Sequence, residues 1–351
     1  MNILITGGCG FIGCNAAARF AQLGHHVTLL DNLSRACTDL NLTWLRQRPT
    51  KLSGQAPFRF VNADVRDASA VNDLMREGGF GVVLHLAAQV AVTTSVKDPV
   101  NDFQINAVGT FNVLDALRRH CPEAVFLNAS TNKVYGKLHG LPTVETPTRY
   151  TLANGAVGVA ESQPLDFHSP YGCSKGAADQ YTVDYARIYG LRTVNFRQSC
   201  IYGLRQFGME DQGWVAWFMI AHELGKPITV YGTGKQVRDL LFVDDLVECY
   251  LRAVERSDGV AGMTFNVGGG PENALSIVEF FDLLGGLSGR PVVHQEADWR
   301  PGDERIYVSD NRRACELLDW RPRTQVQEGI VRLRNWVVEN RSVLAGAGCY
   351  S

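Results

Sequence analysis

Tyr171 and Lys175 stand four residues apart in the run Ser-Pro-Tyr-Gly-Cys-Ser-Lys, and this spacing places both side chains on one face of a helix. A free tyrosine has a pKa of about 10 and is a poor base at neutral pH. A neighbouring ammonium group and a helix N-terminus both favour the phenolate. We therefore predict Tyr171 as a proton acceptor whose pKa is lowered by Lys175. The spacing alone would favour an ordinary surface tyrosine and lysine, because this pattern occurs often by chance.

Thr131 adds a hydroxyl group to this pair. It follows an apolar run at residues 124–128 that predicts a buried strand, and residues just past such a strand face the ligand crevice of an open α/β sheet. Thr131 would hold a reacting hydroxyl oxygen by a hydrogen bond, and Tyr171 would accept the proton of that hydroxyl. The positive charge of Lys175 would lower the pKa of Tyr171. Together the three side chains suit the oxidation of an alcohol.

A glycine-rich turn begins directly after the first apolar run, residues 2–6. It fits the pattern G-x-G-x-x-G and precedes a predicted helix at about residues 11–23. Glycines leave the backbone open to a diphosphate, and the helix N-terminus attracts it. The predicted phosphate-binding residues are Gly7, Gly10, Phe11, Ile12 and Gly13.

Asp31 ends the second apolar run, residues 26–30. A carboxylate at this distance from the glycine turn accepts hydrogen bonds from an adenosine ribose, and it repels a 2′-phosphate. The pattern therefore favours NAD over NADP. The alternative is a glycine turn in an α/β protein that binds no ligand. The strand, the glycine turn, the helix and the acidic residue all occur here in the expected order and spacing, which favours the dinucleotide site.

Further cofactor contacts are expected at the ends of the next predicted strands, residues 58–61 and 81–86. Asp64 either reads the adenine amino group or caps the following helix. Small side chains at 87 and 88 would let a ribose approach the backbone. With the helix that contains Asn106, the candidates are Asn32, Asp64, Val65, Ala87, Ala88, Gln89 and Asn106, besides Tyr171 and Lys175.

The bulk composition excludes several other classes. The 351 residues are 45% hydrophobic with a net charge of −2, which argues against a nucleic-acid partner. The start lacks a basic leader, and the longest apolar helical run, residues 214–221, is too short to span a membrane, so we expect a cytoplasmic protein. The nine cysteines show no metal-ligand spacing.

The order of elements predicts an α/β fold: a doubly wound parallel (Rossmann) sheet with a smaller interleaved α/β lobe. We expect residues 1–200 and about 236–262 in the cofactor domain, and about 201–235 and 263–345 in the substrate domain. Residues 137–168 would form a lid or binding loop. Residues 346–351 would form a flexible tail.

Four segments carry a resemblance to a known family: residues 130–136 (STNKVYG), 168–180, 202–207 and 211–214. The chain resembles the extended short-chain dehydrogenase/reductases, in their nucleotide-sugar epimerase branch, over nearly its whole length. The resemblance implies a tightly held NAD that oxidises a sugar alcohol to a ketone. The ketosugar then turns and takes the hydride back on its other face. The resemblance also implies inversion at C2 of a CDP-linked hexose.

The same resemblance implies that the second lobe holds the nucleoside diphosphate. Arginine suits a diphosphate because its guanidinium binds two oxygens at once. Trp214 and Trp217 would wall the base or sugar pocket, or else make core or subunit contacts. Helices of the first lobe would pair subunits into a homodimer or homotetramer. The substrate contacts implied, besides Thr131, are Arg238, Arg300, Arg205 and Asn195.

Other functions on the same scaffold remain to be weighed. A sugar 4,6-dehydratase needs a carboxylic acid and a carboxylate beside the threonine, whereas Asn132 and Lys133 follow Thr131 here. An epimerase for C4 or another base, or a dehydrogenase or reductase that releases its cofactor, would share the same residues. A non-catalytic NAD-binding protein would have no need of Thr131, Tyr171 and Lys175 together.

Overall fold

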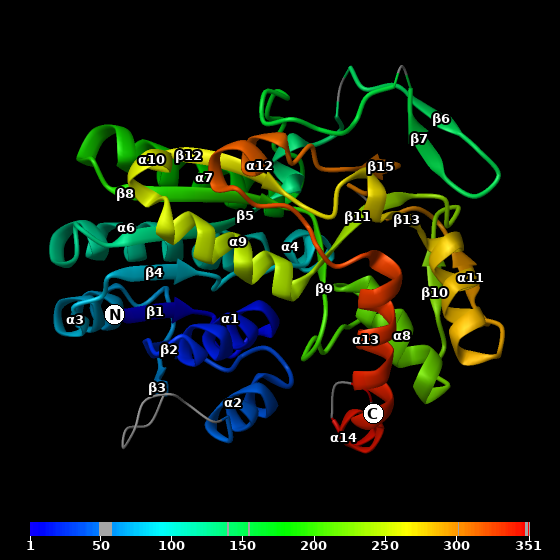
Figure 1. Cartoon of the computed structure of the whole chain (residues 1–351), viewed down its shortest axis with the longest axis horizontal. Coiled ribbons are helices and arrows are strands. Elements are labelled where there is room, and N and C mark those ends of the chain that lie inside the picture. The colour runs from blue at the N-terminus through cyan, green and yellow to red at the C-terminus, as the bar shows by residue number, and fades with distance from the viewer. Residues whose placement is uncertain (49–57, 139, 154, 301, 348–349, 351) are drawn as a thin grey trace.

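A parallel β-sheet and a smaller mixed lobe lie side by side in the computed structural model (Figure 1). The structure describes residues 1–351 except 49–57, 139, 154, 301, 348–349 and 351. Within the described residues no helix has the length and apolar character needed to cross a membrane.

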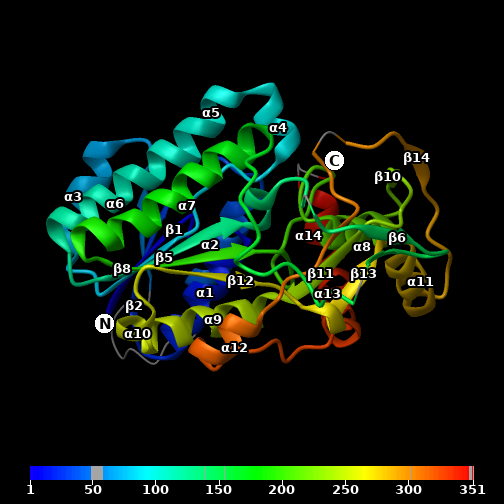
Figure 2. The same ribbon diagram turned by 90° about the horizontal axis from the view of Figure 1, so that it is seen from above.

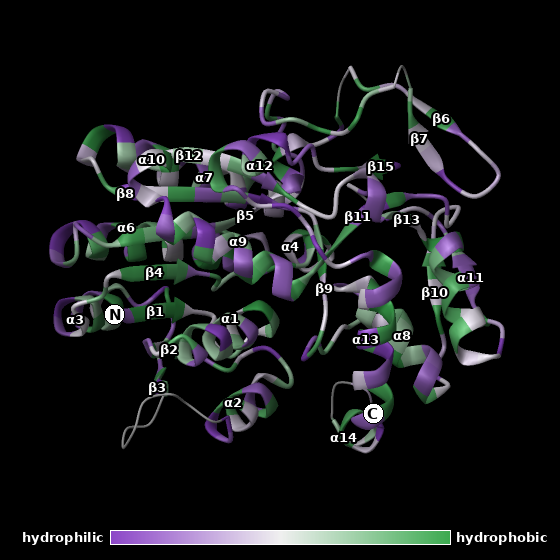
Figure 3. Ribbon diagram, viewed as in Figure 1, coloured by the Kyte–Doolittle hydropathy of each residue, from purple (hydrophilic) through white to green (hydrophobic). Residues whose placement is uncertain are grey.

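Seven parallel strands form the sheet of the larger lobe. The inner strands are buried on both faces, as is usual in parallel sheets, whereas the edge strand Phe58–Asn62 is partly exposed. Colouring by hydropathy shows apolar residues along the strands of this sheet (Figure 3). The strand order changes direction between β1 and β4, the point at which such sheets bind ligands. In order across the sheet the strands are β12 (Met263–Val267), β8 (Arg192–Gln198), β5 (Val125–Thr131), β4 (Val82–His85), β1 (Asn2–Thr6), β2 (His26–Asp31) and β3 (Phe58–Asn62).

Helices cover both faces of this sheet (Figure 2). Side chains alternate along each strand, so Ile3 and Ile5 pack with one helical layer while Leu4 packs with the other. One layer contains α1 (Phe11–Gln22), α2 (Thr38–Arg46), α9 (Val243–Glu255), α10 (Ser257–Val260) and α12 (Arg312–Leu318). The other contains α3 (Ala68–Gly78), α4 (Val92–Lys97), α5 (Pro99–Phe103), the π-helical turn η1 (Gln104–Val108), α6 (Gly109–His120) and α7 (Ser169–Tyr189). The prediction of a doubly wound Rossmann sheet is confirmed.

The smaller lobe has a hydrophobic core of its own, built around α8, α11 and α13. In its largest sheet, β11 is the central strand and pairs with β9, β13 and β15. The strands are β9 (Cys200–Tyr202), β10 (Thr229–Tyr231), β11 (Val237–Phe242), β13 (Ala274–Ser276), β14 (Gln295–Ala297) and β15 (Ile306–Tyr307). The helices are α8 (Trp214–Leu224), the turn η3 (Pro271–Asn273), α11 (Ile277–Ser288), α13 (Val326–Glu339) and α14 (Arg341–Gly346).

The structure departs from the expected domain boundaries. Strand β12 pairs with β8 and completes the larger sheet, although we expected residues 263–345 in the substrate domain. Conversely, β11 belongs to the smaller lobe rather than to the cofactor domain. In both cases, the lobe to which a strand belongs is decided by its pairing with strands far away in the chain. The order of elements along the sequence does not show this pairing.

The long connection at residues 137–168 and the C-terminal tail also differ from expectation. The connection follows the turn η2 (Asn132–Tyr135) and contains a two-stranded hairpin, β6 (Thr143–Glu145) and β7 (Tyr150–Leu152), that lies beside the smaller lobe. In the tail, the Tyr350 hydroxyl donates to the Gly208 carbonyl at 2.8 Å and the ring stacks on Trp217. The tail is thus anchored at this residue.

Candidate functional site

The glycine turn forms one wall of a cleft of about 530 Å³ between the lobes. Gly7 has a φ of +66°, and a Cβ there would lie 2.8 Å from the Ala87 backbone nitrogen. A Cβ on Gly13 would lie 2.3 Å from the Gly7 carbonyl oxygen, so α1 can approach β1 only with glycine at this position. No side chain caps the N-terminus of α1. Its free N–H groups therefore suit a phosphate. The predicted residues that line the cleft here are Gly7, Gly10, Phe11, Ile12 and Gly13.

Asp31 lies at the end of β2 and lines the same cleft. Its carboxylate accepts one hydrogen bond from the Cys9 backbone at 2.9 Å and another from the Leu33 backbone at 2.8 Å. Burial raises its pKa, and these two bonds oppose the rise. The carboxylate thus fixes the glycine turn against β2 while it retains acceptor capacity for a ribose.

Asp64 lines the cleft close to Asn32. It accepts from the Asn32 amide at 2.7 Å and from the Arg66 guanidinium at 2.8 and 2.9 Å, and the hydrogen bonds from Arg66 lower its pKa to about 2. Helix α3 is capped by Asp67 instead. The helix-cap interpretation of Asp64 is therefore wrong, and in this structure each of its carboxylate oxygens already accepts two hydrogen bonds from Asn32 and Arg66.

The three predicted chemical side chains meet in the cleft. Thr131 ends β5, and Tyr171 and Lys175 lie in the first two turns of α7. The Thr131 hydroxyl lies close enough to Tyr171 to favour its phenolate and so to lower its pKa. The Lys175 ammonium donates to the Ala129 carbonyl at 2.6 Å. A sugar hydroxyl that enters between Thr131 and Tyr171 can bond to both.

Burial sets the pKa of both partners in α7. It raises the pKa of Tyr171 to about 12, with the nearby charge of Asp102 adding to the rise and the Thr131 hydrogen bond opposing it. Burial also lowers the pKa of Lys175 to about 8, against the opposing charges of Asp179 and Asp102. The lowered tyrosine pKa that we expected from Lys175 is thus absent in the chain alone, because desolvation of the phenolate outweighs the stabilising interactions.

Two predicted arginines lie on the opposite, smaller-lobe wall of the cleft. The Arg238 guanidinium, on β11, pairs with Asp303 at 2.6 Å and with Glu304 at 3.1 Å. The Arg300 guanidinium stacks over the Tyr231 ring with 3.8 Å between guanidinium carbon and ring centroid. The two arginines thus stand on the same wall, where a diphosphate could bridge them.

Comparison with known proteins places the chain in a family. The model of the NAD dependent epimerase/dehydratase family matches residues 3–268. The chain belongs to this family. It is 42% identical to a CDP-paratose 2-epimerase of Salmonella typhi over 341 residues, which cover 96% of this chain and 99% of that protein. This confirms the resemblance described above.

Solved structures agree with this family assignment. The UDP-glucose 4-epimerase of Thermus thermophilus, in complex with NAD, is 30% identical with a TM-score of 0.78, over 96% of this chain and 99% of that one. The UDP-glucose 4-epimerase of Thermotoga maritima, with UDP-glucose, is 27% identical with a TM-score of 0.79, over 97% of this chain and 100% of that one. The epimerase/dehydratase described here is an enzyme, and its cofactor is NAD.

Two predicted cofactor contacts of this epimerase/dehydratase lie behind the cleft wall. Val65, Ala87 and Ala88 line the cleft, whereas Gln89 and Asn106 do not. The Asn106 amide bonds to both backbone groups of Gln89, at 2.9 and 3.0 Å. Through these bonds, Asn106 shapes the segment that follows β4.

Asn195 lies inside the protein, away from the cleft. It is fully buried in β8, accepts from Asn128 at 2.8 Å and donates to Asp179 at 2.6 Å. The resemblance placed it among substrate contacts, but its register in the sheet turns it toward this buried network, so we do not retain it.

Arg205 lines the cleft, and two of its guanidinium nitrogens donate to the first lobe. Its guanidinium donates to the Asn41 side chain at 2.9 Å and to the Leu40 carbonyl at 2.8 Å. It therefore fastens the smaller lobe to α2. Of the two tryptophans, Trp214 lines the cleft, and Trp217 packs on Tyr350.

Sequence reasoning missed two glutamines in the cleft. The side-chain carbonyl oxygens of Gln206 and Gln236 are buried without a hydrogen-bond partner. A buried acceptor without a partner is costly, so both suit a ligand with donor groups. Gln206 follows Arg205 and Gln236 lies two residues before Arg238. Their closeness to predicted substrate-binding arginines was the signal in the sequence that could have identified them.

Proposed function

We propose that this enzyme inverts C2 of a CDP-linked hexose or deoxyhexose, a substrate of the CDP-paratose and CDP-tyvelose type, through a 2-keto intermediate. The observation that carries the proposal is the meeting of Thr131, Tyr171 and Lys175 in the cleft that also contains the glycine turn. The 42% identity to a CDP-paratose 2-epimerase along the full chain supports the base and the carbon.

The cofactor fits the first-lobe wall of the cleft. The glycine turn and the uncapped N-terminus of α1 accept a diphosphate, and Asp31 accepts a ribose hydroxyl. When bound there, NAD would supply the hydride acceptor and donor for the sugar carbon. A single retained cofactor of this kind is sufficient for inversion without net oxidation.

The residues of the chain move the proton and orient the sugar. Thr131 donates to or accepts from the reacting hydroxyl and holds it beside Tyr171. Tyr171 takes the hydroxyl proton as the ketone forms and gives it back when the alcohol is restored. Lys175 stabilises the phenolate in this step. Arg238 and Arg300 would hold the diphosphate while the ketosugar turns.

A 4,6-dehydratase is the family's other reaction type, and the residues disfavour it here. Elimination of water needs an acid and a base beside the threonine, where Asn132 and Lys133 stand. The nearby carboxylates of Asp303 and Glu304 are both paired with Arg238. The alternatives are a C4 epimerase, an epimerase for a sugar linked to another nucleotide base, and a dehydrogenase that releases its cofactor. Each would give a different product in the following experiment.

The test is a panel of CDP-, GDP- and UDP-sugars incubated with the enzyme in deuterated water, with products identified by NMR. We expect a C2 isomer of a CDP-sugar with little solvent deuterium at C2 and no net change in nicotinamide absorbance. Tyr171→Phe and Lys175→Ala should each cut turnover by about 10²-fold or more with NAD still bound. A C4 isomer, or net reduction of added NAD, would refute the proposal.

A further inference from the structure

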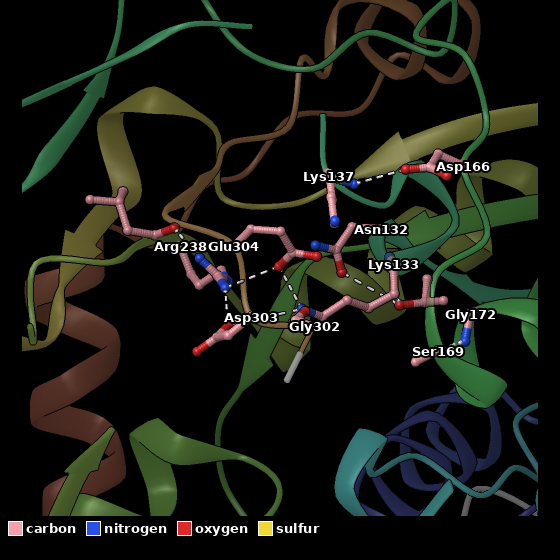
Figure 4. A network of polar contacts seen from close by, with 12 residues as sticks. Asn132, Lys133, Lys137, Asp166, Ser169, Gly172, Arg238, Gly302, Asp303 and Glu304 are labelled. Carbon is pink, nitrogen blue, oxygen red and sulfur yellow. Dashed lines mark hydrogen bonds and ion pairs between the residues drawn. The ribbon is translucent and has the colours of Figure 1, made fainter. Parts of the chain in front are cut away.

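A cluster of charged side chains joins the two lobes at the catalytic end of the cleft (Figure 4). Lys133 lies in η2, directly after β5, and Glu304 lies just before β15. The Lys133 ammonium contacts the Glu304 carboxylate at 2.5 Å and the Gly302 carbonyl at 3.1 Å. The same Glu304 oxygen is 3.1 Å from the Arg238 guanidinium. An ion pair that bridges the lobes here is largely shielded, with side-chain exposures of 21% and 12%.

The same residues separate two cavities. Lys133, Gly302 and Asp303 line the catalytic cleft. They also line a second cavity of about 300 Å³, together with Glu304 and Lys137. The Lys133–Glu304 pair is therefore part of the wall between the catalytic cleft and a side cavity.

Lys133 is also connected to the catalytic threonine. Its backbone N–H donates to the Thr131 hydroxyl at 3.2 Å, and Thr131 and Tyr171 line the same cleft. Lys133 thus contacts the Thr131 hydroxyl through its backbone and the smaller lobe, at Glu304, through its side chain.

We propose that the Lys133–Glu304 ion pair is a latch that keeps the ketosugar enclosed while it turns, with Lys133 as a positioning residue. This inference rests on the proposed function. A ketosugar that leaves before the hydride returns would leave the enzyme with a reduced cofactor, and closed sites prevent such side reactions. Without the lysine, Glu304 would keep Arg238 as its cationic partner among the residues that the structure describes, and the segment Gly302–Glu304 would lose its hydrogen bond and ion pairs with Lys133.

The first arm of the test measures the latch without substrate. Hydrogen exchange of the peptide that spans residues 302–307 is compared in the NAD-loaded wild type, Lys133→Met and Glu304→Gln. We expect exchange to accelerate at least about fivefold in both variants. Lys137→Met is the matched control, since Lys137 lines the side cavity from the same lobe as Lys133; its exchange should equal that of the wild type.

The second arm measures escape of the intermediate during turnover of a CDP-sugar. Lys133→Met and Glu304→Gln should accumulate reduced nicotinamide and free ketosugar roughly tenfold faster than the wild type. Lys133→Arg, which keeps the charge, should restore retention, and Lys137→Met should not leak. The double variant Lys133→Met/Glu304→Gln should leak no more than either single variant, because both remove the same contact.

The outcomes separate the latch from the proposed function. Unchanged exchange in Lys133→Met and Glu304→Gln would overturn the latch, whatever the wild type catalyses. Faster exchange without faster escape would also overturn it, because the pair would then be only a structural contact. A wild type that isomerises no sugar of the panel, with the exchange result as expected, would refute the proposed function instead.

Discussion

At the scale of single residues, Lys175 carries a burial penalty that can be measured. Burial lowers its pKa from 10.5 to about 8, so between these pH values the unfolded chain binds more protons than the folded one. Stability therefore rises with pH across this window. Below pH 8 both states are protonated and the penalty is complete.

We predict that the wild type gains up to about 3 kcal/mol of unfolding free energy relative to Lys175→Met as pH rises from 8 to 10.5. Urea unfolding of both proteins at several pH values measures this, and the comparison cancels all other titrating groups. Lys137→Met, at an exposed position, should show no such trend. A difference between wild type and Lys175→Met that is independent of pH would contradict the prediction.

Asp31 is the residue that we expect to select the cofactor. Asp31→Asn keeps an acceptor for only one of the Cys9 and Leu33 backbone N–H groups, and it removes the charge that repels a 2′-phosphate. We predict weaker NAD binding and roughly tenfold relaxed discrimination against NADP. Calorimetric titration of the cofactor-free protein with both dinucleotides measures the ratio, and an unchanged preference would exclude Asp31 as the ribose reader.

At the scale of elements, the approach of α1 to β1 depends on one missing methyl group. A Cβ at Gly13 would meet the Gly7 carbonyl at 2.3 Å, whereas nothing lies within 4 Å of one at Gly286 in α11. We predict that Gly13→Ala destabilises the protein by about 1–3 kcal/mol and weakens NAD binding. Gly286→Ala, the control, should gain roughly 0.5–1 kcal/mol. Equal thermal shifts in the two variants would contradict this packing.

Sequence reasoning succeeded where an element is defined by its own residues. The strands β1, β2 and β3 each contain several apolar residues in a short run, and the helix α7 contains Tyr171 and Lys175 at the predicted spacing. Sequence reasoning failed where a position depends on contacts between distant parts of the chain. Strand β12 joins the larger sheet beside β8, and the Asn195 side chain donates to Asp179. Lys133 and Glu304 are 171 residues apart in the sequence, so no local sequence pattern predicts their contact.

At the scale of the whole molecule, α6 and α7 lie side by side on the outside of the larger lobe (Figure 2), and both helices carry exposed apolar side chains. These side chains are Phe111, Tyr181, Ile188 and Tyr189, which are 41–66% exposed. Phe111 and Tyr181 pack edge to face across the two helices, with ring centroids 5.8 Å apart. Exposed apolar side chains on two neighbouring helices suit an interface about a two-fold axis, so we propose a second copy of this chain as the partner.

We predict that light scattering of the wild type gives the mass of a dimer or a tetramer and that Ile188→Asp lowers it to a smaller species. A buried unpaired charge in such an interface costs several kcal/mol, on the order of 2–5. Val338→Asp, at an exposed position in α13, should leave the mass unchanged. A monomeric wild type would exclude this interface.

The most direct measurement of the central claim follows one hydrogen atom. The enzyme is given a CDP-linked hexose that carries deuterium at C2, in ordinary water and without added cofactor, and the epimer is examined by NMR and mass spectrometry. We predict that the deuterium is found at C2 of the inverted product, because the hydride leaves and returns within one closed site. Loss of the label to water, or its retention at a carbon that has not been inverted, would contradict the account.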